Sequence, residues 1–257
     1  MSCPSSVSVV CSRLVVPAAL IVAGLAALPA CSSIDSDDID TDAITADLTA
    51  RPRADGSATE LAATLAAGAL TFIDLQAGDR LVASSGDVQV ELSANEVLGV
   101  MSYGATLDGV GEVGATVTVA FEREAFASAP SSTVELPAPV SITAPDAGAA
   151  FSRAEDDLVI ALAGSASDDA VRVSWSGDCV VADGIDVPAG QASVTIARGT
   201  LAKAERSSSD ADAAPIADSC SLRIVAERTI EGVLDPAYEG GRITAVTSDS
   251  REVTTSP

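Results

Sequence analysis

The sequence contains no histidine, and aromatic residues make up only 3% of it. Without histidine, the chain cannot form a Ser-His-Asp or Cys-His catalytic site, or a histidine-ligated zinc or iron centre. Lys203 is the single lysine and no Ser-x-x-Lys motif ends on it, so the serine hydrolases that use this motif are excluded as well. So few aromatic side chains cannot line a sugar-binding cleft of the kind that two catalytic carboxylates would need. We therefore expect a protein that is not an enzyme.

Basic residues are also scarce. The 257 residues include 14 Lys plus Arg against 37 Asp plus Glu, a formal net charge of -23. Such a chain repels phosphate backbones, so we expect no nucleic-acid partner. The hydrophobic content of 47% is nevertheless too high for a disordered acidic chain. The length allows one or two folded domains of about 100–200 residues each.

No apolar run is long enough to cross a bilayer comfortably. The longest extends from Leu14 to Leu28 and includes Pro17 and Gly24. As a helix it would span about 22 Å, well short of a hydrocarbon core of about 30 Å. Arg13 stands before the run, and no acidic residue precedes it. This arrangement is typical of a secretory signal peptide, which we assign to residues 1–30.

The run ends in the motif Leu28-Pro29-Ala30-Cys31. This motif resembles the lipobox of bacterial lipoproteins, although Pro29 stands where that family usually has a small residue. The resemblance implies that Cys31 becomes the first residue of the mature chain, carries fatty acyl chains such as palmitate, and anchors the protein to a membrane. In the same family, Ser32 after the cysteine implies sorting to the outer membrane of the cell envelope. The alternative is an ordinary signal peptide followed by an unmodified Cys31.

Two cysteines remain in the mature chain besides Cys31, namely Cys179 and Cys220. An exported protein folds under oxidising conditions, so this pair predicts one disulfide. Closing such a loop stabilises the fold by roughly 4 kcal/mol in the chain-entropy treatment. A redox-active pair is the alternative, but the Cys-x-x-Cys spacing is absent.

Residues 31–43 are polar and strongly acidic. A stretch of this composition buries too little apolar surface to order itself, so we predict a disordered tether between lipid and fold. Asp38, Asp40 and Asp42 have the spacing of the first calcium ligands of an EF-hand. However, Ala43 and Thr49 occupy the positions where that loop needs Gly and Glu.

Beyond residue 44, short alternating runs are separated by turn residues, which indicates β-strands. The run at 61–70 could be helical by propensity, but its neighbours favour a strand. We expect an all-β fold of one or two antiparallel β-sandwich domains. The clearest predicted strands are residues 69–75, 80–84, 88–92, 116–123, 157–164, 170–177, 192–198, 220–232 and 242–248.

A proline-rich stretch at 132–148 suggests a boundary between domains. We divide the chain there into an N-terminal β domain, residues 44–136, and a C-terminal domain, residues 137–257. The C-terminal domain opens with a strand, a Pro- and Gly-containing turn and a second strand, which loosely resembles an immunoglobulin-type start. Trp175 precedes both cysteines, whereas antibody domains have tryptophan between them. The resemblance therefore implies architecture only.

A calcium site is the most specific hypothesis that the acidic residues allow. If 157–164 and 170–177 formed a hairpin, then Glu155, Asp156 and Asp157 would lie close to Asp178. Carboxylate oxygens gathered in this way could bind Ca²⁺, the only cofactor we consider. The alternative is that these acidic side chains simply stabilise turns.

No motif in the sequence names a partner. We expect a membrane-anchored protein that acts by contact with another envelope protein, in scaffolding, adhesion or assembly. The alternative is a module that binds Ca²⁺ or an envelope glycan, and a carboxylate-dependent hydrolase is a more distant third.

Overall fold

The computed structural model describes residues 32–76, 78–97, 100–164, 169–205 and 215–257. The signal peptide predicted at 1–30 and the predicted acylation site Cys31 lie outside these residues. Residues from Cys31 to Pro257 form one compact unit. Among the described residues, no helix is long and apolar enough to cross a bilayer. The fold is all-β, as the sequence predicts, and it buries its apolar residues in two separate clusters.

The N-terminal cluster lies between two sheets. One sheet of four strands has the order β10-β9-β5-β6, and the facing strands belong to a sheet of eleven strands. The elements of this part of the chain are β1 (Ser32–Asp35), the short 3-10 helices η1 (Ser36–Asp38) and η2 (Thr41–Ala43), β2 (Thr45–Pro52), β3 (Ala58–Ala66), β4 (Thr71–Asp74), β5 (Arg80–Ser85), β6 (Val88–Glu91), β7 (Ser93–Val97), β8 (Val100–Asp108), β9 (Thr116–Glu122) and β10 (Ala129–Glu135).

The C-terminal cluster lies between a three-stranded sheet, β11-β13-β16, and the other end of the eleven-stranded sheet. Its strands are β11 (Ser141–Ala144), β12 (Ala150–Ser152), β13 (Leu158–Ala163), β14 (Val171–Gly177), β15 (Val180–Val187), β16 (Ser193–Ile196), β17 (Cys220–Glu231) and β18 (Gly240–Ser256). Each part is thus a sandwich of two sheets, and we call them the N-terminal and C-terminal sandwiches.

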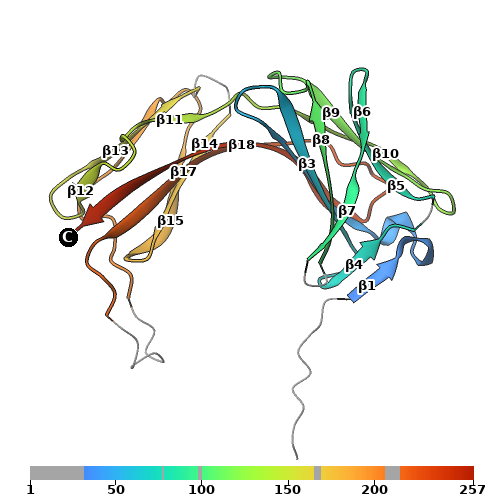
Figure 1. The fold of residues 1–257 in the computed structure, drawn as a ribbon, viewed down its shortest axis with the longest axis horizontal. Coiled ribbons are helices and arrows are strands. Elements are labelled where there is room, and N and C mark those ends of the chain that lie inside the picture. Colours follow the sequence, from blue (N-terminus) through green and yellow to red (C-terminus); the bar gives the residue numbers. More distant parts are fainter. Residues whose placement is uncertain (1–31, 77, 98–99, 165–168, 206–214) are drawn as a thin grey trace, which may run out of the picture. The chain divides into compact units, whose positions relative to one another are not determined.

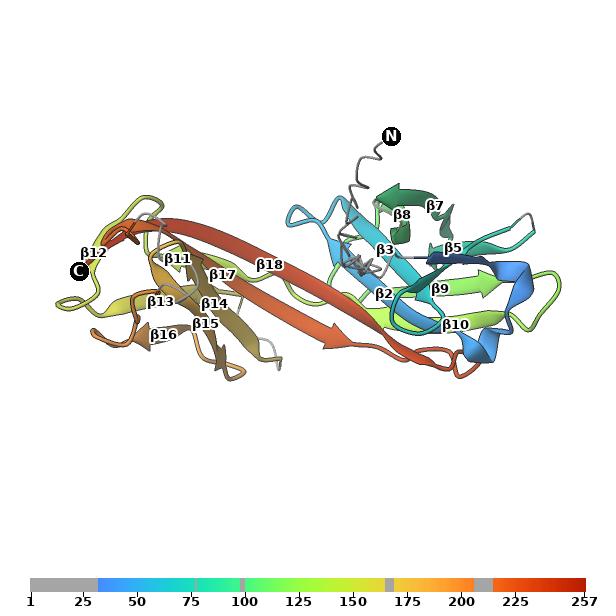
Figure 2. The same ribbon diagram turned by 90° about the horizontal axis from the view of Figure 1, so that it is seen from below.

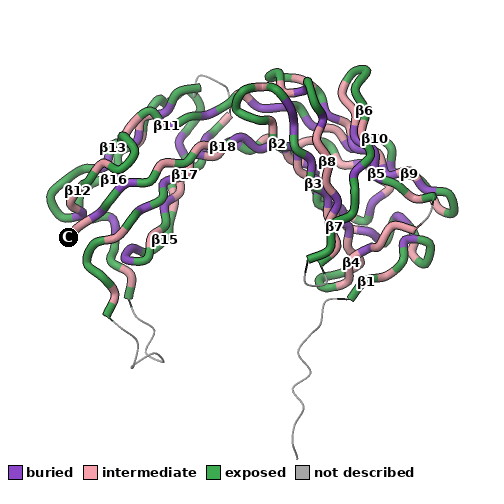
Figure 3. Tube along the Cα trace, viewed as in Figure 1, coloured by how far each residue is buried: buried purple, intermediate pink, exposed green. Residues whose placement is uncertain are grey.

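Alternation of apolar and polar residues explains most of these strands. In β9, Val117, Val119 and Phe121 are buried while the residues between them are partly exposed. The same pattern follows β14 and β17, where Val173, Trp175 and Ile224 face the C-terminal core. Figure 3 shows buried and exposed positions alternating along the strands. Successive side chains point to opposite faces of a strand, so each strand has one face for the core and one for solvent.

Two long strands are common to both sandwiches. β17 and β18 pair antiparallel from Cys220–Thr255 to Glu231–Thr244 (Figures 1 and 2). The first residues of β18 pair in parallel with β2 of the N-terminal sandwich, whereas Val253 near its end faces the C-terminal core. Gly241 permits the parallel approach, because its φ is +112° and a Cβ there would lie 2.0 Å from the Ala46 carbonyl oxygen.

This sharing corrects the domain division at 136/137. Tyr238, Ile243 and Ala245 belong to the N-terminal core although they lie within the range 137–257. The two clusters do separate between Leu136 and Val140, where the prolines suggested a boundary. The contribution of β18 to the N-terminal core was not predictable, because the alternation along a strand does not say which core its buried face will cover.

The prediction of a disordered tether at 31–43 is wrong for the residues that the structure describes. Ser32–Asp35 form β1, which pairs in parallel with β4, and Ile34 and Ile39 pack against the N-terminal core. Ser36 and Thr41 are buried. Two isoleucines and the partners described below are enough to order an otherwise acidic segment.

The predicted hairpin of 157–164 with 170–177 is also wrong. β13 pairs with β11 and β16, whereas β14 pairs with β15 and β17 in the opposite sheet. The chain therefore crosses from one sheet to the other between these strands. Both strands cover the same core from opposite sides, so alternation alone could not distinguish this arrangement from a hairpin.

Candidate functional site

The disulfide predicted between Cys179 and Cys220 is present. Cys179 and Cys220 form a disulfide with a Cα–Cα distance of 5.7 Å. The disulfide adjoins the C-terminal core, since Cys179 is fully buried. The buried Arg153 guanidinium lies beside it, with Nη1 3.6 Å from the Cys179 sulfur and Nη2 donating to the Asp218 carbonyl at 2.8 Å. This disulfide is a structural link within the sandwich.

The structure does not gather the predicted calcium ligands into one site. Asp156 accepts a hydrogen bond from the Ser152 N–H, and Asp157 accepts one from the Arg198 N–H. Glu155 and Asp178 are exposed. The hairpin that would have brought these four residues together does not form, and they are not among the described acidic residues whose oxygens converge.

A different acidic group does converge. Carboxylate oxygens of Asp35, Asp37 and Asp38 lie within 4.8 Å of one another, and all three residues are exposed. Asp35 also accepts a hydrogen bond from the Gln76 side chain at 3.0 Å. Exposed carboxylates in turns often lie close together without binding an ion, so this group does not define a metal site.

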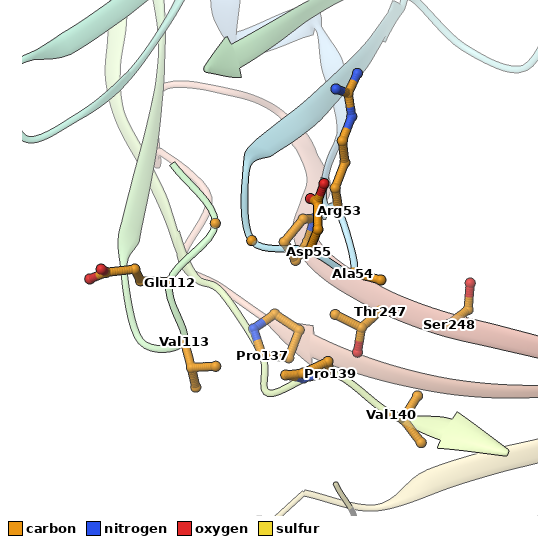
Figure 4. A pocket seen from close by; sticks show the side chains of 13 residues that line it. Arg53, Ala54, Asp55, Glu112, Val113, Pro137, Pro139, Val140, Thr247 and Ser248 are labelled. Carbon is orange, nitrogen blue, oxygen red and sulfur yellow. The ribbon is translucent and has the colours of Figure 1, made fainter. Parts of the chain in front are cut away.

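A pocket of about 340 Å³ lies where four segments of the chain meet. Four segments line it: the turn between β2 and β3, the loop between β8 and β9, the link between β10 and β11, and the middle of β18. Its lining residues are Pro52, Arg53, Ala54, Asp55, Gly56, Gly111, Glu112, Val113, Pro137, Pro139, Val140, Thr247 and Ser248 (Figure 4). We call it the link pocket.

One wall of the link pocket depends on two glycines. A Cβ at Gly111 would lie 2.4 Å from the Gly56 carbonyl oxygen, so the two loops approach closely only because residue 111 carries no side chain. Gly56 also has a φ of +69°. Thr59 strengthens the contact, because its hydroxyl donates to the Val110 carbonyl at 2.7 Å.

The opposite wall, at Pro137–Pro139, is held by a buried arginine. Arg228 donates from Nη1 to the Ala138 carbonyl at 2.6 Å and from Nη2 to the Gly164 carbonyl at 2.8 Å. Thr247, its neighbour on β18, also donates to the Ala138 carbonyl. Burial lowers the pKa of the Arg228 guanidinium, while the charge of Asp169 acts in the opposite direction.

The polar groups of the link pocket are mostly engaged within the protein. Arg53 pairs with Glu60 at 3.1 Å, and Figure 4 shows its side chain directed away from Pro137 and Pro139. The hydrogen bond with Ser57 lowers the pKa of the Asp55 carboxyl, so Asp55 is ionised at neutral pH. No lining side chain forms a nucleophile–base pair with another. The pocket can therefore receive apolar groups, but its own residues offer no chemistry.

The sequence did contain signals for the buried arginines. Arg228 shares its parity with Leu222, Ile224 and Ala226, so it continues the apolar face of β17. Arg123 likewise continues the face of Val119 and Phe121. A charged residue on a strand's buried face requires partners, and this is what the structure supplies. The glycine contact between residues 56 and 111 left no recognisable signal.

Known proteins offer only distant likenesses to this chain. No protein-family model matches the chain, and no curated protein matches it. Similar solved structures include a cytokine receptor complex, with 10% identity, a TM-score of 0.30 and coverage of 79% of this chain and 95% of that one. Another is a chain from the complex of Dpr11 IG1 with DIP-gamma IG+IG2, with 10% identity, a TM-score of 0.23 and coverage of 82% of this chain and 95% of that one.

A third is the pair of tandem V-type regions of a v-region-containing chitin binding protein, with 10% identity, a TM-score of 0.20 and coverage of 83% and 99%. At such TM-scores these likenesses carry no argument about function. The assignment to the all-β class rests on the strands and sheets described above.

Proposed function

We propose that the protein is a lipid-anchored, non-enzymatic component of the cell envelope that acts by contact with another envelope protein. The link pocket carries this proposal. Prolines and valines form much of its lining, and Val113 is 61% exposed. The Ala138 carbonyl, between the lining residues Pro137 and Pro139, already accepts hydrogen bonds from Arg228 and Thr247. Such a pocket suits an apolar side chain of a partner protein, which would be recognised by shape and burial.

The anchor is supported by the lipobox-like motif at Leu28–Cys31, and Ser32 after it favours the outer membrane. Mass spectrometry of the N-terminal peptide tests this part directly. We expect a mature chain that begins at Cys31 and carries acyl chains. A chain that begins elsewhere, or an unmodified Cys31, would contradict the anchor without affecting the pocket.

The contact is tested by crosslinking in intact cells. A photo-crosslinking residue at Val113 should give one discrete protein adduct, and Pro139→Glu should abolish it because the charge enters the apolar pocket. Val159 is a matched control, since it is exposed on β13 outside the pocket. The same adducts from both positions, or an adduct at Val113 that survives Pro139→Glu, would refute the proposal.

A further inference from the structure

The first described residue is already part of a sheet. The Ser32 N–H donates to the Leu70 carbonyl at 3.1 Å, and the Ser32 hydroxyl lies 3.2 Å from that of Thr71. From Ser32 to Asp35, β1 then pairs with β4. The residue next to Cys31 is therefore held firmly by the N-terminal sandwich, with no flexible tether after it.

The directions of the strands bring the β7–β8 hairpin to the same end of the N-terminal sandwich as the start of β1. β8 runs antiparallel to β3, so it starts at the end where β3 finishes and β4 begins. Val97 and Val100 form the last pair of the β7–β8 hairpin at that end. β8 also contacts both β1 and β4. In Figure 1, the start of β1 lies near the lower ends of β4 and β7.

This end exposes apolar side chains. Leu70 is 47% exposed, Val97 57% and Val100 37%. We call these three residues the apolar end. Exposed apolar residues that gather in one place mark an interaction surface more often than exposed residues scattered singly.

The segments that meet here carry little charge at this end, although the exposed Glu96 stands directly before Val97. Residues 61–73 and 97–107 contain no charged residue, nor do residues 31–34, although charged residues make up 20% of the chain. Elsewhere the surface is strongly acidic. The anionic headgroups of a bacterial membrane would repel most of that surface, whereas this end can approach them.

We propose that the apolar end lies against the surface of the bilayer that holds the acyl chains of Cys31. The inference rests on the proposed acylation of Cys31. One residue spans at most about 3.6 Å, so an acylated Cys31 would hold Ser32 and its neighbours at the headgroup level. Leu70, Val97 and Val100 then insert into the interface, and the N-terminal sandwich stands on the membrane in one orientation.

Tryptophan fluorescence tests this contact. Trp175 is the single native tryptophan and is buried in the C-terminal core, so it serves as an internal reference. The acylated full-length variants Leu70→Trp and Val97→Trp would be placed in phosphatidylethanolamine–phosphatidylglycerol vesicles with brominated acyl chains. Val159→Trp, in the C-terminal sandwich, is the matched control.

We expect brominated lipid to quench most of the added fluorescence at positions 70 and 97, and none at 159 or at Trp175. Equal quenching at 70, 97 and 159 would overturn the proposal, and so would no quenching at 70 and 97. A crosslink from position 97 to a protein in cells, without quenching in vesicles, would assign the apolar end to a protein partner instead.

Flotation of the same vesicles separates this test from the test of the anchor. Acylated protein that floats without quenching contradicts the apolar end alone. Protein that neither carries acyl chains nor floats contradicts the anchor, and the apolar end with it. The triple variant Leu70→Glu/Val97→Glu/Val100→Glu should still float through its acyl chains, while a tryptophan added at Thr71 should lose its quenching.

Discussion

The two sandwiches fix segments that lie outside their cores by different bonds. In the C-terminal sandwich a covalent link, Cys179–Cys220, joins the turn after β14 to the start of β17. In the N-terminal sandwich a single arginine takes this role. Arg123 pairs with Asp79 at 3.0 Å and donates to the Thr41 hydroxyl at 2.8 Å and to the Ser36 carbonyl.

The surroundings of Arg123 show why a charge can stay buried there. Its guanidinium carbon lies 5.0 Å from the centre of the Phe121 ring and 4.6 Å from that of Phe126. Its side chain is 0% exposed. Rings and oxygens together replace the water that the guanidinium has lost. Polar segments outside a core can thus be held either by a crosslink or by a fully partnered arginine.

Replacing the arginine should have the largest effect on this comparison. Arg123→Ala leaves the buried Asp79 side chain without its ion-pair partner. It also removes the hydrogen bonds that hold the 3-10 helices η1 and η2, so the free energy of unfolding should fall by about 3–5 kcal/mol. Urea unfolding measures the loss, and amide exchange should rise across residues 36–43. The matched control is Arg80→Ala, whose pair with Glu122 is exposed and should contribute below about 1 kcal/mol. Equal losses in the two variants would refute the assigned role.

Removing the disulfide should cost a comparable amount of stability. Cys179→Ala/Cys220→Ala opens a loop with a sequence separation of 41 and should lower the free energy of unfolding by roughly 4 kcal/mol. Trp175 reports on the C-terminal core, whereas both tyrosines, Tyr103 and Tyr238, lie in the N-terminal core. We expect the tryptophan transition to move to lower urea than the tyrosine transition. Coincident transitions would show that the shared strands β17 and β18 make the two sandwiches unfold as one.

A third test concerns the loop that links β17 to β18. Asp235 accepts hydrogen bonds from the Ser131 N–H at 2.7 Å, the Ser131 hydroxyl at 2.6 Å and the Ala237 N–H at 2.9 Å. Asp235→Ala leaves these donors without an acceptor and should destabilise the fold by about 1–3 kcal/mol. Thermal unfolding measures the change. A loss as large as that of Arg123→Ala would contradict the ranking.

The same residue gives a pH dependence. Burial raises the pKa of Asp235, but the hydrogen bonds from Ser131 and Ala237 outweigh burial and leave the pKa below its usual value. The stabilisation is therefore present above the unfolded-state pKa and is lost as the pH falls through the folded-state pKa. Asp235→Asn should lose this part of the acid sensitivity, below about pH 4. Identical acid profiles of Asp235→Asn and the parent protein would refute the assignment.

The smallest changes in stability should come from replacing the two tyrosines by phenylalanine, and the two replacements should differ. The Tyr103 hydroxyl donates to the Ile73 carbonyl at 2.8 Å and accepts from the Leu75 N–H at 3.0 Å, so Tyr103→Phe should cost about 1 kcal/mol. The buried Tyr238 hydroxyl has no hydrogen-bond partner among the described residues, so Tyr238→Phe should be neutral or slightly stabilising. Thermal melts of the two variants would compare them. A larger loss for Tyr238→Phe would contradict this reasoning.

Alkaline titration sharpens the tyrosine comparison. Burial raises the pKa of Tyr103 to about 12, although the hydrogen bond from Leu75 acts against it. A raised pKa means that stability is complete below the unfolded-state pKa of about 10 and falls as the pH rises toward 12. Burial also raises the pKa of Tyr238. A tyrosine absorbance that titrates near pH 10 in the folded protein would refute the burial of both rings.

Several features of the fold follow from short stretches of sequence. The strands at β5, β9, β13 and β14 lie close to their predicted ranges, because alternation directly records which face of a strand is buried. The disulfide followed from counting cysteines, and the break between the two cores followed from the prolines near residue 137. These are local properties, so a short stretch of sequence is enough to predict them.

Other features were missed for a common reason. The order of residues 32–43 depends on Arg123, which is more than eighty residues away. The link pocket depends on the approach of Gly56 to Gly111 and on Arg228 holding the Ala138 carbonyl. The four predicted calcium ligands do not converge because the strands that should have formed a hairpin entered opposite sheets.

The sequence alone determined the all-β class, the faces of the strands, the pairing of Cys179 with Cys220 and the separation into two cores. Each of these depends on which side chains leave water, and hydrophobic burial is set by side-chain type and spacing. Only the tertiary structure decided strand partners, the sharing of β17 and β18, and the positions of the buried arginines. Those choices depend on contacts between residues far apart in the chain, where many pairings bury the same apolar faces and only the complete set of hydrogen bonds and packed side chains selects one.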